Sequence, residues 1–231
     1  MSAIFPSVRA IGEGKGETLF YLTAKTITGT VAWEAFHTLR ENGLKFKVTA
    51  ITAKEKLCFL DSPECTPEKC PYAKGHFDRV NDAVYELWTT EEVYSREVIR
   101  AHAEKWQVCP FEMCLDLSVW VDGVICDYNY AFDPNVHLKR FFGENISGDY
   151  IFLIDEAHNL VERGREMYSA EISRQTLFTL RKKIRKHFPK LARALDKASR
   201  QMLELEEDLK ASQNPYQVLS NPGVLPITFL T

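Results

Sequence analysis

An α/β core is indicated by residues 18–51, which open with the apolar run Thr18-Leu19-Phe20-Tyr21-Leu22-Thr23. A run of this length and composition is typical of a strand buried on both faces of a parallel sheet. Residues 30–42 then carry apolar side chains at helical spacing and end at Gly43, and a second strand is predicted over residues 46–51. The alternation of strand, helix and strand predicts a parallel α/β fold.

Further elements extend this core on both sides. Residues 2–11 are predicted to form a helix, and strands are predicted again over residues 124–130 and 150–154. Residues 55–123 differ from the core: cysteine, proline and charged residues come first, and helical stretches follow, one of them introduced by Thr89-Thr90-Glu91-Glu92 in the form of a capping box. We therefore expect residues 55–123 to be an insertion that lies outside the sheet.

The chain after Glu162 is predicted to be helical. Seven side chains there fall at alternating spacings of three and four residues: Phe188, Leu191, Leu195, Ala198, Met202, Leu205 and Leu209. This seam predicts a long helix that packs against the preceding helix of Leu177, Leu180 and Ile184, although a zipper that binds a partner is an alternative. Residues 214–231 are predicted to be a loop leading into a strand.

Composition excludes several classes of protein. The chain has 231 residues, of which 45% are hydrophobic and 26% charged, which is typical of a folded domain. Its apolar runs are shorter than the roughly 18 residues of a membrane span, and residues 1–12 lack the pattern of a secretion signal. We therefore expect no membrane partner and a cytoplasmic location, associated with the nucleoid if the protein is bacterial.

The charge is unevenly distributed along the chain. The formal net charge of −3 argues against a uniformly basic surface for nucleic acid, yet residues 174–200 carry ten Lys or Arg and one acidic residue, Asp196. This segment predicts a local positive field. It is either the solvated face of a helical hairpin or a guide for phosphate groups.

An acidic motif follows the last predicted strand. The strand Tyr150-Ile151-Phe152-Leu153-Ile154 runs directly into Asp155-Glu156-Ala157-His158. Two adjacent carboxylates at a strand end suit nucleotide hydrolysis, because one can hold Mg²⁺ beside the phosphates while the next activates the attacking water. An acidic pair that merely begins a helix is the plainer alternative. We favour the hydrolytic site, because the four-residue string and the strand before it rarely coincide.

Six cysteines are present, and their spacing favours an iron-sulfur cluster over zinc. Cys58, Cys65 and Cys70 lie close together in the sequence, and Cys109 follows after 38 residues, directly before Pro110. Zinc sites normally pair their ligands as Cys-x₂₋₄-Cys on both sides of a loop, and a second pair exists here only if Cys109 is joined by Cys114. A [4Fe-4S] cluster accommodates the observed spacing better.

The remaining two cysteines, Cys114 and Cys126, are expected to be small apolar core residues, because Cys114 follows an apolar run and Cys126 lies in a predicted strand. Cys114 nevertheless competes with Cys65 as the second cluster ligand. If the cluster is real, the fold must bring Cys58, Cys70 and Cys109 within reach of one inorganic centre.

Taken in order, several motifs resemble the iron-sulfur DNA helicases of superfamily 2, of the XPD and DinG type with a DEAH box. The segments that carry the resemblance are Leu22-Thr23-Ala24-Lys25-Thr26, Lys56-Leu57-Cys58, Trp106-Gln107-Val108-Cys109-Pro110-Phe111, Cys126-Asp127-Tyr128-Asn129-Tyr130 with Asp133-Pro134, and Asp155-Glu156-Ala157-His158. The resemblance covers residues 1–180 by sequence and the remaining helices by architecture only. Each motif is moderately specific, and their shared order is highly specific.

The resemblance implies an ATP-dependent helicase that moves 5′ to 3′ along single-stranded DNA. It implies an incomplete RecA-like motor domain over residues 1–54 and 124–162, an iron-sulfur domain over residues 55–123 and part of a helical arch over residues 163–231. Both bound partners are implied as well: ATP with Mg²⁺, and single-stranded DNA. The oligomeric state is not implied, and we expect a monomer.

The resemblance also implies roles for individual residues, which form three groups. Asp155 would hold Mg²⁺, Glu156 would be the catalytic base, and His158 would couple the nucleotide to the second motor domain. Thr23, Lys25 and Thr26 would hold the DNA backbone, with Tyr128 near the DNA path, although an aromatic side chain with a structural role is an equal alternative there. In the arch, the basic segment with Lys182 and Lys186 would guide phosphates, and Cys58, Cys65, Cys70 and Cys109 would hold the cluster.

The sequence departs from the family pattern in two ways. A Gly-x-x-x-x-Gly-Lys-Thr phosphate loop is absent, so we expect the chain to begin just after it. A second motor domain with its arginine finger is absent too, and we expect negligible ATPase activity from the isolated chain. The alternative function is therefore a non-catalytic module that holds a metal or a cluster and grips single-stranded DNA.

Overall fold

The computed structural model describes residues 3–24, 26–61 and 64–211. Side chains are described throughout these ranges except at residues 26–28 and 209. The chain divides into two compact units, Met1–Tyr168 and Ser169–Thr231, and each is described by itself.

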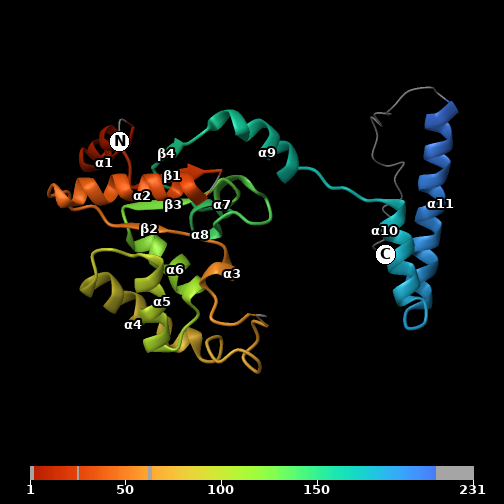
Figure 1. Ribbon diagram of the computed structural model, residues 1–231, viewed down its shortest axis with the longest axis horizontal. Helices are drawn as coiled ribbons and strands as arrows, with labels where there is room; N and C mark the ends of the chain where they lie inside the picture. Colours follow the sequence, from red (N-terminus) through yellow and green to blue (C-terminus); the bar gives the residue numbers. More distant parts are fainter. Residues whose placement is uncertain (1–2, 25, 62–63, 212–231) are drawn as a thin grey trace. The chain divides into compact units, whose positions relative to one another are not determined.

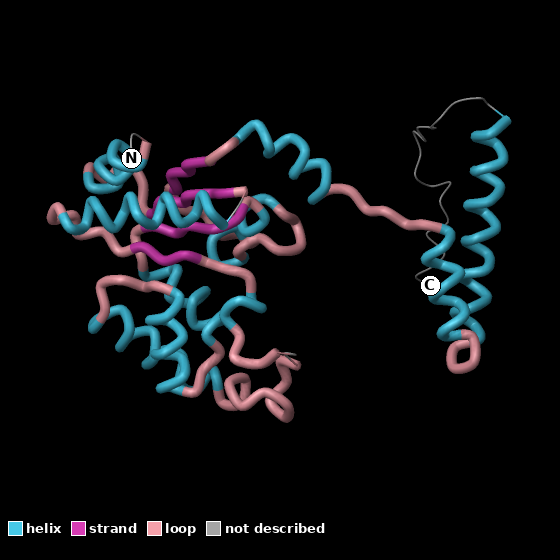
Figure 2. Tube along the Cα trace, in the orientation of Figure 1, coloured by secondary structure: helices cyan, strands magenta, loops and turns pink. Residues whose placement is uncertain are grey.

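The first unit is built on a parallel sheet, drawn in magenta in Figure 2. Its strands, in the spatial order β2-β3-β1-β4, are β2 (Val48–Ala50), β3 (Gly123–Asp127), β1 (Thr18–Thr23) and β4 (Tyr150–Ile154). Each neighbouring pair is parallel, and Leu22 of β1 lies opposite Cys126 on one side and Ile154 on the other. The predicted α/β fold with a parallel sheet is confirmed.

One face of the sheet is covered by two helices, α1 (Ile4–Gly12) and α2 (Thr26–Glu41) (Figure 1). The central strands turn Leu19 and Ile125 toward this face, where both side chains are buried in one apolar cluster with residues of the two helices. Side chains alternate between the faces of a strand, so β1 can bury residues on both. This explains why its sequence is continuously apolar.

The opposite face is covered by the inserted residues between β2 and β3. Four helices form in the insertion: α3 (Lys54–Leu57), α4 (His76–Thr90), α5 (Arg96–Trp106) and α6 (Pro110–Leu117). Phe20 and Leu22 of β1 are buried in one cluster with Leu87, Ile99 and Met113 of these helices. The insertion therefore lies outside the sheet, as predicted, but shares its apolar core.

Lys47 joins the insertion to the sheet where β2 begins. Its ammonium donates hydrogen bonds to the Tyr94 hydroxyl at 2.8 Å and to the Glu91 carbonyl at 3.3 Å, and lies 4.7 Å from the centre of the Trp88 ring. A half-buried ammonium needs such partners, because burial without them is costly. The contact fixes the loop that follows α4.

Two predicted boundaries are wrong. Thr89 and Thr90 end α4 instead of beginning the next helix, and Ser95 caps α5 by accepting a hydrogen bond from the Val98 N–H at 3.3 Å. Helix α2 begins at Thr26, four residues before the predicted start. The segment expected to hold a DNA strand therefore ends at the first residue of a helix, Thr26.

The third predicted strand is too long. β3 ends at Asp127, and residues 129–132 form the short helix α7 (Asn129–Phe132). The Asp127 carboxylate accepts a hydrogen bond from the Asn129 N–H at 2.9 Å, which turns the chain out of the sheet. Tyr128 and Tyr130 are consequently not strand residues.

Short elements complete the first unit. They are η1 (Ser118–Trp120), α8 (Lys139–Phe142), η2 (Ala157–Asn159) and α9 (Leu160–Met167). The rings of Phe141 and Phe142 in α8 pack on Phe20 with centroid separations of 5.0 and 5.2 Å. Helix α8 thus extends the aromatic part of the core.

The second unit is a helical hairpin of α10 (Arg174–Ile184) and α11 (Pro189–Ala211). Leu177, Leu195 and Ala198 are its buried core, as the seam predicts. The first two residues of the predicted seam, Phe188 and Leu191, are exposed, so the buried seam is shorter than predicted.

The loop leading into a strand that is predicted over residues 214–231 falls outside the described residues. Within the described part of the chain, none of the helices combines the length and apolar character needed to span a membrane.

Candidate functional site

The carboxyl ends of the parallel strands meet at one edge of the sheet. β1, β3 and β4 end at Thr23, Asp127 and Ile154, and they are paired side by side. Ligands of open parallel α/β sheets bind at this edge, where the connecting loops leave the sheet. The predicted motifs at the ends of β1, β3 and β4 are thereby brought to one place.

The acidic motif stands at the tip of β4. The half-buried Asp155 continues the pairing, because its N–H donates a hydrogen bond to the Leu22 carbonyl at 2.9 Å. Glu156 is exposed and adopts the left-handed conformation, with φ 51° and ψ 43°. His158 Nδ1 lies 3.4 Å from a carboxylate oxygen of Glu156. The structure thus brings Asp155, Glu156 and His158 together in one turn.

The side chain of Asp155 contributes to the pKa of a neighbouring tyrosine, Tyr21. Burial raises the pKa of Tyr21 on β1, and the Asp155 carboxylate adds to this shift. Negative charge beside a phenol disfavours the phenolate, so this contribution reflects the closeness of the Asp155 side chain to β1. A carboxylate held at a strand end in this way can bind Mg²⁺.

A cavity of about 660 Å³ opens at the same edge, beside β1 and β3. Thr23 ends β1 and lines it, and the neighbouring wall comes from Thr30 of α2 and Thr52 after β2. The Oγ1 atom of Thr52 is buried and has no hydrogen-bond partner among the described residues. Three threonines thus contribute to the cavity walls.

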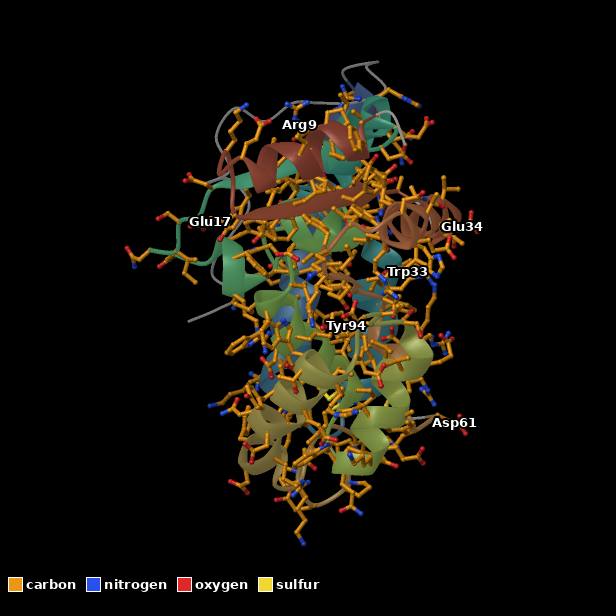
Figure 3. The ribbon with its side chains drawn as sticks, turned by 90° about the vertical axis from the view of Figure 1, so that its left-hand side faces the viewer. Arg9, Glu17, Trp33, Glu34, Asp61 and Tyr94 are labelled. Carbon is orange, nitrogen blue, oxygen red and sulfur yellow. The ribbon has the colours of Figure 1, made fainter. Side chains whose placement is uncertain are left out.

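The insertion supplies another wall of this cavity, which the sequence analysis missed. Ser95 and Arg96, at the beginning of α5, line the cavity together with Tyr94. Tyr94 and Trp33 of α2, which both line it, are labelled close to one another in the side-chain view of Figure 3. Serine is a residue type that often caps helices, so the sequence indicates a helix start at Ser95. The sequence does not indicate that Ser95 lies near the edge of the sheet.

The cavity walls combine apolar side chains with hydroxyl groups and charges of both signs. Hydroxyl groups and the cations Lys56 and Arg96 lie on its walls, and a single-stranded backbone offers phosphates that such groups hold without reading sequence. Asp127 and Glu97 also line it, so its charge is mixed.

The predicted DNA-binding residues of the first unit lie in different surroundings. Thr23 lines the cavity, although only 5% of it is exposed. Thr26 is the first residue of α2. Lys25 lies outside the described residues. Tyr128 is fully buried and donates a hydrogen bond to the Asp155 carbonyl, which fits the structural role given as its alternative, and its place near a DNA path stays a prediction. Burial removes the ring face on which a base could stack.

The four predicted cluster ligands are free cysteines, two of which, Cys65 and Cys70, lie between α3 and α4. Cys58 follows α3 and Cys109 precedes α6, and both are half-buried. Cys65 is exposed and Cys70 is buried. Burial raises the pKa of the Cys109 thiol, and its backbone N–H donates to His76 Nδ1 at 3.2 Å.

Two of these thiols lie near one ammonium. A hydrogen bond with Cys65 raises the pKa of Lys54, and the charge of Cys109 acts in the same direction. Cysteine sulfur is the usual ligand of an iron-sulfur cluster. However, no three His, Cys, Asp or Glu side chains among the described residues are arranged to hold a metal ion. The expected convergence of Cys58, Cys70 and Cys109 is not seen.

Cys114 and Cys126 are both buried, as predicted for core residues. Burial raises the pKa of Cys114 to about 11. Its sulfur lies 3.8 Å from the hydroxyl of Thr49, a residue of β2. Burial also raises the pKa of Cys126 on β3. Both thiols therefore favour the neutral form, which is a poor metal ligand.

The second unit carries the predicted basic residues on its outer surface. Lys182 and Lys186 are exposed, and the Lys182 ammonium lies 4.5 Å from the centre of the Phe178 ring. Arg181 is instead paired with Asp196 at 2.6 Å, across the hairpin. Part of the basic segment is thus structural and part is available to anions.

Known proteins match this chain over much of its length. The DEAD_2 family profile matches residues 39–177. The Fanconi anemia group J protein homolog of Gallus gallus is 30% identical over 100 residues, which are 43% of this chain and 7% of that protein. The general transcription and DNA repair factor IIH helicase subunit XPD/RAD3 of Saccharomyces cerevisiae is 29% identical over 131 residues, 57% of this chain and 16% of that protein.

A solved structure shares the fold. A structure described as truncated XPD is 20% identical, with a TM-score of 0.57, and the match covers 88% of this chain and 57% of that one. The chain spans a small part of the length of its curated relatives. Because the family profile covers more than half of the chain, the chain belongs to the DEAD_2 family.

Proposed function

We propose that the protein containing this chain is an ATP-dependent helicase that moves 5′ to 3′ along single-stranded DNA. The observation that carries the proposal is the acidic turn at the tip of β4, next to the strand β1 whose end lines a cavity with hydroxyl groups and cations on its walls. Nucleotide and DNA groups would thus be held by neighbouring strands of one sheet. Relatives described as helicase subunits support the activity, and its direction rests on the motif resemblance.

The acidic turn has the parts of a nucleotide-hydrolysis site. Asp155, anchored by its backbone to β1, would hold the Mg²⁺ of the nucleotide. Glu156 is exposed and would accept the proton of the attacking water. His158, in contact with Glu156, would pass the state of the nucleotide to a second motor domain.

The DNA strand would follow the sheet edge. Thr23, Lys25 and Thr26 would contact its backbone from β1 and the start of α2, and Arg96 would add a cation from the insertion. Lys182 and Lys186 would attract phosphates from the hairpin unit. These groups recognise charge and not base sequence, which suits a translocating enzyme.

The insertion would hold a [4Fe-4S] cluster through Cys58, Cys65, Cys70 and Cys109. Support comes from the absence of disulfides at these described thiols and from the ammonium of Lys54, which lies near two of them. A bound cluster would cross-link the loops before α4 and α6. We further propose the domain division given by the motifs, a monomeric state, and a cytoplasmic or nuclear location.

The decisive experiment replaces Glu156 in the full-length polypeptide. Glu156→Gln keeps the size of the side chain and removes the base, so we expect DNA-stimulated ATP hydrolysis to fall by about a hundredfold or more while single-strand binding persists. Glu144→Gln is the matched control, since Glu144 is also an exposed carboxylate. ATP hydrolysis that survives Glu156→Gln would refute the assignment. Robust DNA binding without any ATP hydrolysis in the wild type would favour the non-catalytic module.

A further inference from the structure

Tyr128 lies at the junction of three strand ends. It follows the last residue of β3, and its side chain is fully buried. Its N–H donates a hydrogen bond to the carbonyl of Thr23 at the end of β1, at 3.2 Å. Its hydroxyl donates to the carbonyl of Asp155, directly after β4. A single residue thereby links the ends of β1, β3 and β4.

The hydrogen bond to Asp155 restrains a particular peptide group. The Asp155 carbonyl and the Glu156 N–H belong to one planar unit, so fixing the carbonyl oxygen fixes the orientation of the whole plane. The Asp155 N–H is already held by Leu22 at 2.9 Å. Both sides of Asp155 are therefore anchored, one by β1 and the other by the Tyr128 hydroxyl.

The next residue depends on this plane. Glu156 has φ 51°, a left-handed conformation that non-glycine residues seldom adopt. Its own carbonyl accepts a hydrogen bond from the Asn159 N–H at 2.9 Å, but its N–H follows the orientation set at Asp155. The direction in which the Glu156 carboxylate leaves the backbone is thus defined by the peptide that Tyr128 holds.

The phenol is kept as a hydrogen-bond donor. The ordinary pKa of a phenol is about 10, so the Tyr128 hydroxyl keeps the proton that it donates throughout the physiological range.

We propose that Tyr128 is a positioning residue that sets the orientation of Glu156 for hydrolysis and ties it to the DNA-contacting end of β1. The inference deepens the proposed function and rests on it. Tyr128 acts only through the peptide at Asp155, because its ring has no surface from which to touch a ligand. A shift of the Thr23 backbone on binding DNA would reach the acidic turn through this residue.

The test is Tyr128→Phe in the full-length polypeptide, which removes the hydroxyl and keeps the ring. We expect kcat for DNA-stimulated ATP hydrolysis to fall by about tenfold to a hundredfold, because a misplaced base is a poor base, with KM for ATP within about twofold. Tyr150→Phe is the matched control: its hydroxyl also donates to a carbonyl, that of Phe141 at 3.4 Å, but at the opposite end of β4. It should leave kcat unchanged.

A double-mutant cycle separates positioning from general structural support. In a Glu156→Gln background, Tyr128→Phe should cause no further loss of kcat, since the group it positions is gone. An equal loss in both backgrounds, an unchanged kcat in the single variant, or loss of the folded state by Tyr128→Phe would each overturn the proposal. Failure of the proposed function is seen separately, as hydrolysis that survives Glu156→Gln alone.

Discussion

Phe20 of β1 is the centre of the aromatic cluster that secures the strand bearing the acidic turn. Its side chain is fully buried, and its ring centroid lies 5.4 Å from that of Tyr150 and 5.5 Å from that of Phe152, both on β4. Two rings of α8 contact it as well. In the described sheet β4 pairs only with β1, so these contacts carry much of its attachment.

Replacing Phe20 with Ala should lower the free energy of unfolding by about 3–5 kcal/mol, the usual range for removing a buried aromatic ring. With a urea m-value of about 2 kcal/mol/M, the midpoint would move down by about 1.5–2.5 M. Phe20→Leu fills most of the space and loses mainly the ring contacts, so a loss of about 1–2 kcal/mol is expected.

The measurement is urea denaturation followed by circular dichroism, with Phe77→Ala as the control. Phe77 is 86% exposed, and its removal should change the stability by less than about 0.5 kcal/mol. If Phe20→Ala moved the midpoint no further than Phe77→Ala, the cluster would not be anchoring β4, and the reasoning would be refuted.

Three other predictions concern the cysteines and the basic hairpin. Cys65→Ser should abolish iron incorporation on anaerobic reconstitution, measured as iron per chain, whereas full iron content would move the ligand assignment to Cys114. In folded protein freed of iron, at pH 8, iodoacetamide should alkylate exposed Cys65 well before Cys114, because a pKa of about 11 leaves Cys114 roughly 0.1% thiolate; equal labelling by mass spectrometry would contradict the described burial. Replacing Lys182 and Lys186 with Ala should reduce the slope of log affinity against log salt for single-stranded DNA by about 1.4, as measured by fluorescence anisotropy, and an unchanged slope would exclude phosphate contacts at both residues.

The sequence predicted the elements whose patterns are local. β1 was placed correctly because Leu19 and Leu22 are buried on opposite faces, which makes the run continuously apolar. The start of α2 was missed because Gly29 and the β-branched residues at 26–28 are poor helix formers, so the pattern began only at Thr30.

Features that depend on distant residues were harder to predict. After Gly123, strand-forming residue types recur up to Tyr130, yet the strand ends earlier because the Asp127 side chain turns the backbone. The contribution of Arg96 to the cavity depends on how the insertion packs on the sheet, and this packing joins residues about 70 positions from Thr23. The acidic turn was readable because its residues are consecutive.

The left-handed backbone of Glu156 sets a limit on how this protein can be engineered. Glycine would relax that conformation and gain about 1 kcal/mol, so a screen that rewards heat resistance alone would tend to select Glu156→Gly. The more robust protein would lack the carboxylate on which turnover is proposed to depend. Substitutions chosen to raise the thermal stability of this protein should therefore leave Glu156 unchanged and be made at other positions.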